Sequence, residues 1–435
     1  MTPKTFKIKS FGCQMNVYDG DRMAELLGAH GMTPAAETDD ADLVVLNTCH
    51  IREKAAEKAY SDVGRLRRED GSKPLVALAG CVAQAEGAEA KRRSQLIDIV
   101  VGPQAYHRLP EMVAQASRGA RPVDTDMPAI SKFDALPTRK RATPSAFLTV
   151  QEGCDKFCTY CVVPYTRGAE ISRPWNDIVT EAQALVDGGA REIVLLGQNV
   201  NAWAEGDRGL AQLIRALARI DGLERIRYTT SHPVNMSDEL IAAHGEVDKL
   251  MPYLHLPVQS GSSRILKAMN RSHTAETYLA TIEKMRAARP DIAISGDFIV
   301  GFPGETEEDF EATLQIVDAV RYASAYSFKY SPRPGTPAAS MEDQISRDIM
   351  DDRLQRLQAR ITEHQLAFNR SKIGTDTQVL VERRGKLPGQ MIGRSPWLQS
   401  VHVQTAAQAG EIVDVTLVGA GPNSMTGAER ERVAA

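Results

Sequence analysis

Short runs of β-branched and apolar residues alternate with helix-type patterns through the first part of the chain. The predicted strands are Phe6–Ser10, Leu43–Asn47, Leu75–Ala79 and Ile97–Val101. Helical patterns follow these strands, one of them a charged stretch from Ile51 to Arg67. Such alternation indicates a parallel sheet with covering helices. We therefore expect an N-terminal α/β domain at residues 1–120.

The same alternation returns after residue 146. Six predicted strands are separated by helical patterns: Phe147–Val150, Glu192–Leu196, Arg225–Thr229, Tyr253–Leu256, Ile292–Val300 and Ala325–Tyr330. Thr306 and Asp309 resemble a capping box at the start of one helix. Six βα units predict a partial (βα)6 barrel, short of the eight units of a closed one. This barrel is expected at residues 147–371, ending in a charged helix from Arg347 to Ser371.

Two further segments have a different pattern. Residues 121–146 contain Pro122, Pro128, Pro137 and Pro144 without an apolar period, which predicts a linker. Residues 372–435 hold four short strand patterns separated by glycine turns: Thr375–Arg383, Met391–Gly393, Ser400–Gln404 and Glu411–Val418. They predict a small antiparallel β-barrel. The tail from Thr426 to Ala435 is expected to be disordered.

Composition adds three limits. The chain has 435 residues, too many for one compact core. Hydrophobic residues make up 43% and charged residues 25%, but no window approaches the ~20 apolar residues of a membrane helix. The first ten residues have neither signal-peptide nor transit-peptide character. We expect a cytoplasmic protein without membrane contact, whose cysteines stay reduced. Because the net charge is −4, any nucleic-acid-binding surface must be local.

Three of the six cysteines form a C-x3-C-x2-C array: Cys154, Cys158 and Cys161. A structural zinc site needs four ligands, and no fourth cysteine or histidine is nearby. A cubane iron–sulfur cluster also normally takes four. Three ligands therefore favour a 4Fe–4S cluster with one iron open, over zinc or inert buried thiols. The spacing, with Tyr160 before the last cysteine, resembles the radical S-adenosylmethionine (SAM) superfamily, in which the open iron binds SAM.

The other three cysteines each follow a predicted strand of the N-terminal domain. Cys13, Cys49 and Cys81 recur at about one βα repeat. Because parallel strands end at one edge of a sheet, these residues should meet there. A buried cysteine is often only a small hydrophobic residue. Three at equivalent positions instead favour an auxiliary 4Fe–4S cluster, again with one open iron.

Polar, glycine-rich loops follow the predicted barrel strands. Their candidate ligand-binding residues are Gly197, Gln198, Asn199, Ser231, Gln259, Ser260 and Gly301. Glycine lets the backbone approach a ligand, and Gln and Ser can hydrogen-bond an amino-acid or ribose group. Turns need such residues anyway, so the prediction rests on the set. His232 is expected to structure its loop rather than to act as an acid or base.

The C-terminal segment has a candidate basic face. It comprises Arg383, Arg384, Lys386 and Arg394, with Trp397 near them for base stacking. Cations beside an aromatic ring suit RNA binding. An ordinary small β-domain with surface charges is the alternative.

The whole chain resembles the radical-SAM methylthiotransferases, and within them the bacterial tRNA branch. The resemblance rests on FGCQMNVYDGDRM around Cys13, LNTCHIREKAAEKAY around Cys49 and CDKFCTYCVVPYTRG around Cys154. It implies a methylthiotransferase domain, a radical-SAM barrel and a C-terminal TRAM domain. Trp203, where tyrosine is common, is a minor departure.

The resemblance also implies a reaction. SAM bound to the triplet cluster, with Tyr160 and the loop residues as its candidate contacts, would give a 5′-deoxyadenosyl radical. That radical would take hydrogen from C2 of N6-isopentenyladenosine at position 37 of tRNA. A second SAM would methylate sulfur on the auxiliary cluster, and the product would be the 2-methylthio derivative. No catalytic residue is expected beyond the cluster ligands.

The implied partners are the anticodon stem-loop of tRNA, an electron donor such as flavodoxin or ferredoxin, and a sulfur donor. A monomer is expected. One alternative is a methylthiotransferase acting on a ribosomal-protein aspartate or on another tRNA adenosine. A more distant one is a non-catalytic zinc and RNA-binding protein.

Overall fold

The computed structural model describes residues 3–38, 41–50, 53–67, 71–127, 132–137, 139 and 142–430. The chain divides into two compact units. The smaller unit contains Met1–Arg139, Glu152–Asp155 and Cys161–Ile171, and the larger unit contains the rest. Ile51 of the predicted helix and Pro128 of the predicted linker lie outside the described residues. No described helix combines the length and the hydropathy of a membrane span.

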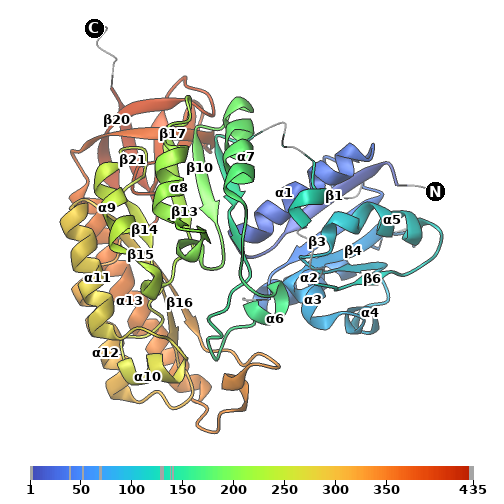
Figure 1. The fold of residues 1–435 in the computed structure, drawn as a ribbon, viewed down its shortest axis with the longest axis horizontal. Helices are drawn as coiled ribbons and strands as arrows, with labels where there is room; N and C mark the ends of the chain where they lie inside the picture. Colours follow the sequence, from blue (N-terminus) through green and yellow to red (C-terminus); the bar gives the residue numbers. More distant parts are fainter. Residues whose placement is uncertain are drawn as a thin grey trace. The chain divides into compact units, whose positions relative to one another are not determined.

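The smaller unit is built on a parallel sheet of order β2-β1-β3-β4-β5-β6 (Figure 1). Its strands are β1 (Thr5–Ser10), β2 (Thr33–Pro34), β3 (Leu43–Thr48), β4 (Leu75–Gly80), β5 (Ile99–Val101) and β6 (Val123–Asp124). Its helices are α1 (Gln14–Ala29), α2 (Glu53–Gly64), α3 (Cys81–Glu86), α4 (Glu89–Arg93), α5 (Leu109–Ser117) and α6 (Val163–Arg167), with 3-10 turns η1 (Tyr106–Arg108) and η2 (Lys132–Ala135).

Strand β3 shows why the sheet has helices on both faces. Leu43 and Val45 pack with residues of α1 and α5, whereas Val44 and Leu46 pack with residues of α2 and α3. Successive strand side chains point to opposite faces, so an uninterrupted apolar strand needs cover on both. The predicted parallel α/β fold is confirmed.

The larger unit begins with two three-stranded parallel sheets, β13-β10-β7 and β14-β15-β16. The strands are β7 (Ser145–Thr149), β10 (Glu192–Leu196), β13 (Arg225–Thr229), β14 (Tyr253–His255), β15 (Ala293–Val300) and β16 (Ser324–Lys329). The helices are α7 (Trp175–Asp187), α8 (Leu210–Leu217), α9 (Asp238–Glu246), α10 (Ser263–Ala268), α11 (Ala275–Ala288), α12 (Glu307–Val320) and α13 (Arg347–Ser371). The six predicted strands are all present, and one apolar core joins them to these helices except α10, whose Ile265 packs in a separate small cluster.

Short elements lie between them: β8 (Gln151–Glu152), β9 (Ile171–Ser172), β11 (Ala204–Glu205), β12 (Arg208–Gly209), η3 (Val200–Ala202), η4 (Pro233–Asn235) and η5 (Pro337–Ser340). The capping box predicted for α12 is confirmed. Thr306 Oγ1 accepts a hydrogen bond from Asp309 N at 3.3 Å, and Asp309 Oδ2 accepts one from Thr306 N at 2.9 Å.

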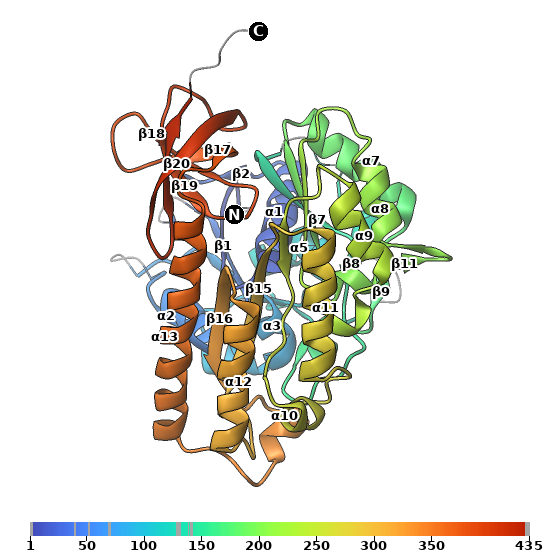
Figure 2. The ribbon, with the colours of Figure 1, turned by 90° about the vertical axis from the view of Figure 1, so that its left-hand side faces the viewer.

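After α13 the chain forms a closed barrel of order β17-β18-β19-β21-β20 (Figure 2). Its strands are β17 (Asp376–Arg384), β18 (Gln390–Arg394), β19 (Ser400–Gln404), β20 (Ile412–Ala420) and β21 (Met425–Glu429). The predicted disorder from Thr426 onward is wrong for β21, which pairs with β19 in parallel and with β20 antiparallel. Its polar sequence carries little strand signal, and pairing on both edges makes it a strand. Residues 431–435 lie outside the described part.

Two arginines of β13 join the barrel to the parallel strands. Arg225 donates to the carbonyl oxygens of Arg394 at 2.8 Å and Gln378 at 2.9 Å. Arg227 donates to Pro396 O at 2.8 Å, and its Nε donates to buried Glu192 at 2.8 Å. These bonds connect the barrel backbone directly to strand β13.

Candidate functional site

Cys13, Cys49 and Cys81, which we call the thiol edge, lie at the carboxyl ends of neighbouring strands. Cys13 precedes α1, Cys49 follows β3, and Cys81 begins α3 directly after β4. The sheet order β1-β3-β4 makes these three strand ends adjacent. A hydrogen bond from Cys49 lowers the pKa of Cys13 to about 6. The structure therefore brings the three predicted ligands to one edge of the sheet.

A buried arginine lies at this edge. Arg167, the last residue of α6, is 3% exposed. Burial raises the pKa of Cys81, and the positive charge of Arg167 opposes that rise. Burial lowers the pKa of Arg167, but Asp19 and the thiols more than compensate, so its pKa is well above the usual value. The site thus contains a permanent cation beside the thiol edge.

Arg167 belongs to a group of four buried charges, the buried charge quartet. Its guanidinium contacts Asp19 Oδ2 and Glu152 Oε1, each at 2.7 Å. Lys132 Nζ contacts the same carboxylates, at 2.7 Å to Glu152 and 3.4 Å to Asp19. Sequence reasoning missed the quartet, because its members come from α1, the predicted linker and both sides of the cysteine triplet.

The chemistry of the thiol edge suits an iron–sulfur cluster. All six cysteines lie in the described part of the chain, and none is in a disulfide. Thiolates are the ligands that such clusters prefer. In that same part, no three His, Cys, Asp or Glu groups are placed to hold a single metal ion. Assignment of the six cysteines as cluster ligands stays a prediction.

The cysteine triplet lies on the loop between β8 and α6. Cys154 N donates to Gly168 O at 3.2 Å. Cys158 is 8% exposed, and its Sγ is 3.7 Å from Arg271 Nη1. Thr159 is held by Met269 O and Ala268 O at 3.1 and 3.0 Å. These bonds fix the backbone on either side of Cys158, as a ligand loop requires.

The loop residues predicted to contact SAM lie at the carboxyl ends of the larger unit's strands. Ser231 is 3% exposed, and its Oγ has no hydrogen-bond partner among the described residues. A buried hydroxyl without a partner is what a polar ligand group would satisfy. Tyr160 packs against a small core formed by Ile265, Met269, Phe302, Tyr330 and Ala338.

His232 structures its loop, as expected. Its Nδ1 accepts from Val234 N at 3.3 Å, and its backbone exchanges two bonds with the Asn201 side chain at 2.9 Å. Burial, with help from nearby Arg271, lowers its pKa to about 2. His232 is therefore neutral at physiological pH and does not act as a proton donor there.

Several other candidates have contacts that shape the loops. Gly197 N donates to Thr229 O at 3.2 Å, and Asn199 N donates to Gln151 Oε1 at 3.0 Å. Gln259 has a positive φ of 78°. Ser260 Oγ accepts from Ser262 N at 3.2 Å. Contact of these residues, and of Gln198, with SAM stays a prediction.

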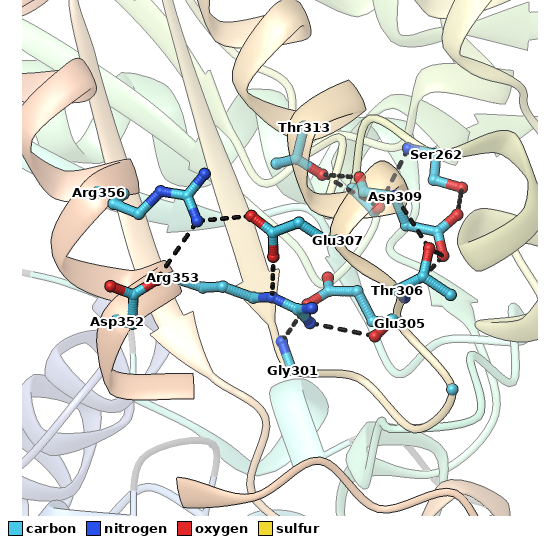
Figure 3. Close-up of polar contacts among 12 residues, drawn as sticks. Ser262, Gly301, Glu305, Thr306, Glu307, Asp309, Thr313, Asp352, Arg353 and Arg356 are labelled. Atoms are coloured by element: carbon cyan, nitrogen blue, oxygen red, sulfur yellow. Dashed lines mark hydrogen bonds and ion pairs between the residues drawn. The ribbon is translucent and has the colours of Figure 1, made fainter. Parts of the chain in front are cut away.

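Gly301 lies within a polar network that joins the loop after β15 to α13 (Figure 3). Gly301 N donates to Glu305 Oε2 at 2.7 Å, and the same oxygen accepts from Arg353 Nη1 at 2.8 Å. A Cβ at Gly301 would lie 2.2 Å from Met350 Cγ. The structure thus gives Gly301 a role in loop packing that spacing alone did not reveal.

The barrel's predicted basic face divides into two kinds of residue. Arg383, Arg384 and Lys386 are exposed, and no described residue forms an ion pair with them. Arg394 is partly used internally, with Nε 3.5 Å from Glu382 Oε2. The expectation that Trp397 stacks on bases is wrong, because its ring lies in the barrel core and its Nε1 donates to Asp291 at 3.3 Å.

Family models match two parts of the chain. Residues 148–317 match the model described as "Radical SAM superfamily". Residues 5–102 match the one described as "Uncharacterized protein family UPF0004". The first match covers the cysteine triplet, and the second covers the thiol edge.

Curated relatives match over nearly the full length. The chain is 68% identical to the tRNA-2-methylthio-N(6)-dimethylallyladenosine synthase of Novosphingobium aromaticivorans, over 98% of this chain and 97% of that protein. It is 69% identical to the synthase of the same name from Sphingopyxis alaskensis, over 98% of both chains.

Solved structures share the fold. The radical S-adenosylmethionine methyltransferase TsrM from Kitasatospora setae, solved with cobalamin and a 4Fe–4S cluster, aligns with a TM-score of 0.57 and 14% identity over 77% of each chain. The cobalamin-dependent S-adenosylmethionine radical enzyme OxsB aligns with a TM-score of 0.53 and 12% identity, over 83% of this chain and 56% of that one. At these identities the likeness concerns the fold alone.

Proposed function

Because this chain belongs to the tRNA-2-methylthio-N(6)-dimethylallyladenosine synthase family, we propose that it methylthiolates N6-isopentenyladenosine at position 37 of tRNA. The product is 2-methylthio-N6-isopentenyladenosine. The observation that carries this function is 68% identity to a named synthase over 98% of the chain. The chain also contains both a radical-SAM region and a UPF0004 region.

The enzyme uses SAM and 4Fe–4S clusters. We assign one cluster to Cys154, Cys158 and Cys161 and the auxiliary one to Cys13, Cys49 and Cys81. When bound, these cofactors supply the one-electron chemistry that removes hydrogen from adenine C2, together with the sulfur and methyl group of the product. The adenine carbon has no acidic proton, so a general base in the protein would not replace them.

The chain's own residues bind the cofactors and orient them. Six thiols hold the clusters, three at each site. Arg271 reaches Cys158 and also donates to Pro257 O at 2.8 Å, which fixes the loop beside the triplet. The unpartnered hydroxyl of Ser231 is our first candidate for a direct SAM contact.

The remaining assignments complete the proposal. Residues 1–120 form the methylthiotransferase domain, 147–371 the radical-SAM barrel and 372–435 a TRAM domain. The predicted linker, 121–146, is not free of structure, because β6 (Val123–Asp124) belongs to the sheet of the smaller unit. The exposed Arg383, Arg384 and Lys386 contact the anticodon stem-loop, with Arg394 beside them. The enzyme acts as a monomer in the cytoplasm, where tRNA is modified. It takes electrons from a donor such as flavodoxin or ferredoxin, and sulfur from a separate donor.

The test is nucleoside mass spectrometry of tRNA from a deletion strain. We expect the 2-methylthio nucleoside to disappear and N6-isopentenyladenosine to accumulate. The wild-type gene should return both nucleosides to their normal levels. A normal level of the 2-methylthio nucleoside in the deletion strain would exclude this substrate.

Two complementing variants separate the roles of the cysteine sets. Cys158→Ala should abolish formation of 5′-deoxyadenosine from SAM. Cys49→Ala should retain 5′-deoxyadenosine formation and yield no thiolated nucleoside. The wild type should contain about eight iron atoms per chain and each variant about four. Thiolated product from Cys49→Ala would refute the division between the two sites.

A further inference from the structure

The buried charge quartet is unusual because all four charged side chains are almost inaccessible. Asp19, Lys132, Glu152 and Arg167 have side-chain exposures of 1%, 1%, 4% and 2%. Removing charges from water is costly unless each is paired and hydrogen-bonded. Pairing is complete here: each cation contacts both carboxylates. Four buried charges beside a candidate cluster site call for a role beyond packing.

The two cations of the quartet face different surroundings. Lys132 Nζ donates to Pro103 O at 2.9 Å and lies 4.6 Å from the centre of the Tyr106 ring. Arg167 Nη2 instead donates to Asn16 Oδ1 at 3.1 Å. The same Asn16 oxygen is 3.6 Å from Cys13 Sγ. One amide oxygen thus bridges Arg167 and the first cysteine of the thiol edge.

Other contacts hold Arg167 at the thiol edge. Helix α6, which ends at Arg167, packs against α3, which begins at Cys81. The Arg167 carbonyl accepts from Gln104 Nε2 at 2.9 Å. Asn16 is itself fixed. Its side-chain Nδ2 donates to Phe11 O at 3.0 Å, and its backbone carbonyl oxygen accepts from Asn47 Nδ2 at 2.6 Å. The guanidinium therefore has one defined place.

We propose that Arg167 is a positioning residue for the auxiliary cluster, whose buried positive charge beside Cys13 and Cys81 raises the cluster's reduction potential. The inference rests on the proposed function, which assigns a cluster to the thiol edge. Adding an electron makes a thiolate-ligated cluster more negative, and a fixed cation in a dry environment stabilises that added charge. Arginine suits the task because it stays protonated and its planar fork can contact two carboxylates and an amide together.

The quartet also explains why the charge is stable there. Asp19 and Glu152 compensate the cost of burying the guanidinium, and Lys132 compensates the second carboxylate charge. Asp19 should then act on the cluster with the opposite sign to Arg167. This opposition distinguishes an electrostatic role from a merely structural one.

The test measures the midpoint potential of the auxiliary cluster by itself. The full chain carrying Cys154→Ala, Cys158→Ala and Cys161→Ala is reconstituted with iron and sulfide, then titrated with dithionite and followed by electron paramagnetic resonance. In this background Arg167→Gln should lower the reduced-to-oxidised ratio of the cluster about tenfold at a fixed potential. This corresponds to a fall of about 59 mV in the midpoint potential. Asp19→Asn should raise the ratio, and Arg167→Lys should keep it within about twofold.

Lys132→Met is the matched control, because it removes the other buried cation from the same carboxylates. It should shift the potential less than Arg167→Gln does. An unchanged potential in Arg167→Gln would overturn the inference, and so would a shift of Asp19→Asn in the same direction. If Arg167→Gln does not fold, Asp19→Asn decides, because the inference requires a raised ratio in that variant. Failure of the triple alanine background to hold any cluster would instead refute the cofactor assignment of the proposed function, and the inference with it.

Discussion

At the scale of single residues, the thiol edge depends on a position without a side chain. Gly12 has a φ of +100°, and a Cβ built there would lie 2.2 Å from Cys49 Cβ and 2.9 Å from Cys49 Sγ. The backbone before Cys13 therefore passes directly over the second cysteine. Glycine is required here both for its left-handed conformation and for the space that it leaves.

Gly12→Ala should displace Cys49 and cost the auxiliary cluster. We expect iron to fall from about eight to about four atoms per chain, while SAM cleavage is retained. Gly31→Ala is the matched control, because Gly31 has a φ of +83° and a Cβ added there would have nothing within 4 Å. It should show only the backbone strain of roughly 1 kcal/mol and keep its iron. Full iron in Gly12→Ala would contradict the crowding argument.

A buried histidine should make the larger unit sensitive to acid. His244 is fully buried, and its Nε2 lies 2.6 Å from Tyr228 Oη. Burial, with a smaller effect of Arg289, lowers its pKa to about 3. The unfolded chain binds a proton at this residue below about pH 6.5, whereas the folded chain does not. Stability should therefore fall as the pH drops below that value, until the folded residue itself titrates.

His244→Gln should weaken this dependence. The variant should be about 1 kcal/mol less stable near neutrality, since it loses the bond to Tyr228. Between about pH 6.5 and 5 its free energy of unfolding should fall less steeply than that of the wild type, by up to about 1.4 kcal/mol per pH unit. Urea unfolding at matched cluster content measures both effects. Parallel curves for the two proteins would show that His244 does not carry the acid sensitivity.

At the scale of elements, the loop after β15 is held by helix α13. The side chains of Glu305 and Arg353 are 1% and 6% exposed, and they meet at 2.8 Å (Figure 3). Gly301 N shares the same carboxylate oxygen at 2.7 Å. A segment close to the expected SAM contacts is thus anchored by a helix that begins over forty residues later.

Arg353→Met should destabilise the larger unit by about 3–5 kcal/mol, because it leaves the Glu305 carboxylate buried without its cation. Adding Glu305→Gln should recover most of the loss, since an amide oxygen still accepts from Gly301 N. Urea unfolding gives the free energies.

Arg356→Met provides the comparison on the same helix. Arg356 contacts Glu307 at 2.6 Å and Asp352 at 3.3 Å, and also Glu311, but all these groups are substantially exposed. Exposed ion pairs contribute little, so the change should cost at most about 1 kcal/mol. If Arg353→Met and Arg356→Met lowered the free energy of unfolding equally, burial of the Glu305–Arg353 pair would not increase its contribution to stability.

At the scale of the whole molecule, an overall negative charge must be reconciled with a polyanionic substrate. The net charge is −4, yet three cations at the end of β17 and the turn after it are exposed and have no ion-pair partner in the described structure. Arg225 and Arg227 fix the barrel that carries them to the parallel strands. We propose that this local basic face makes the phosphate contacts to tRNA.

Arg383→Gln combined with Arg384→Gln should weaken tRNA binding and reduce its salt dependence. The slope of log affinity against log salt should decrease in magnitude by about two, one for each lost phosphate contact. The control combines Arg219→Gln, in the turn after α8, with Lys284→Gln, in α11. It removes the same charge and should leave the slope unchanged. Filter binding over a salt series measures both. If the two double variants showed the same salt slope, Arg383 and Arg384 would not contact the RNA phosphates.

Much of this protein follows from its sequence alone. Parallel strands end at one edge, so a cysteine after each of β1, β3 and β4 was enough to predict the thiol edge. The capping box at Thr306 and helix α13 were also predictable, since both depend on residues within a few turns of each other. Local spacing carries this information, and it needs no knowledge of distant contacts.

Only the tertiary structure decided the rest. Arg167 and Asp19 are 148 positions apart, and no periodicity connects them. Trp397 looked available for stacking until the barrel core enclosed it, and β21 became a strand only through the two partners that flank it. Buried ion pairs and barrel closure are formed between segments far apart in the chain. Their energies depend on burial, which a linear sequence does not display.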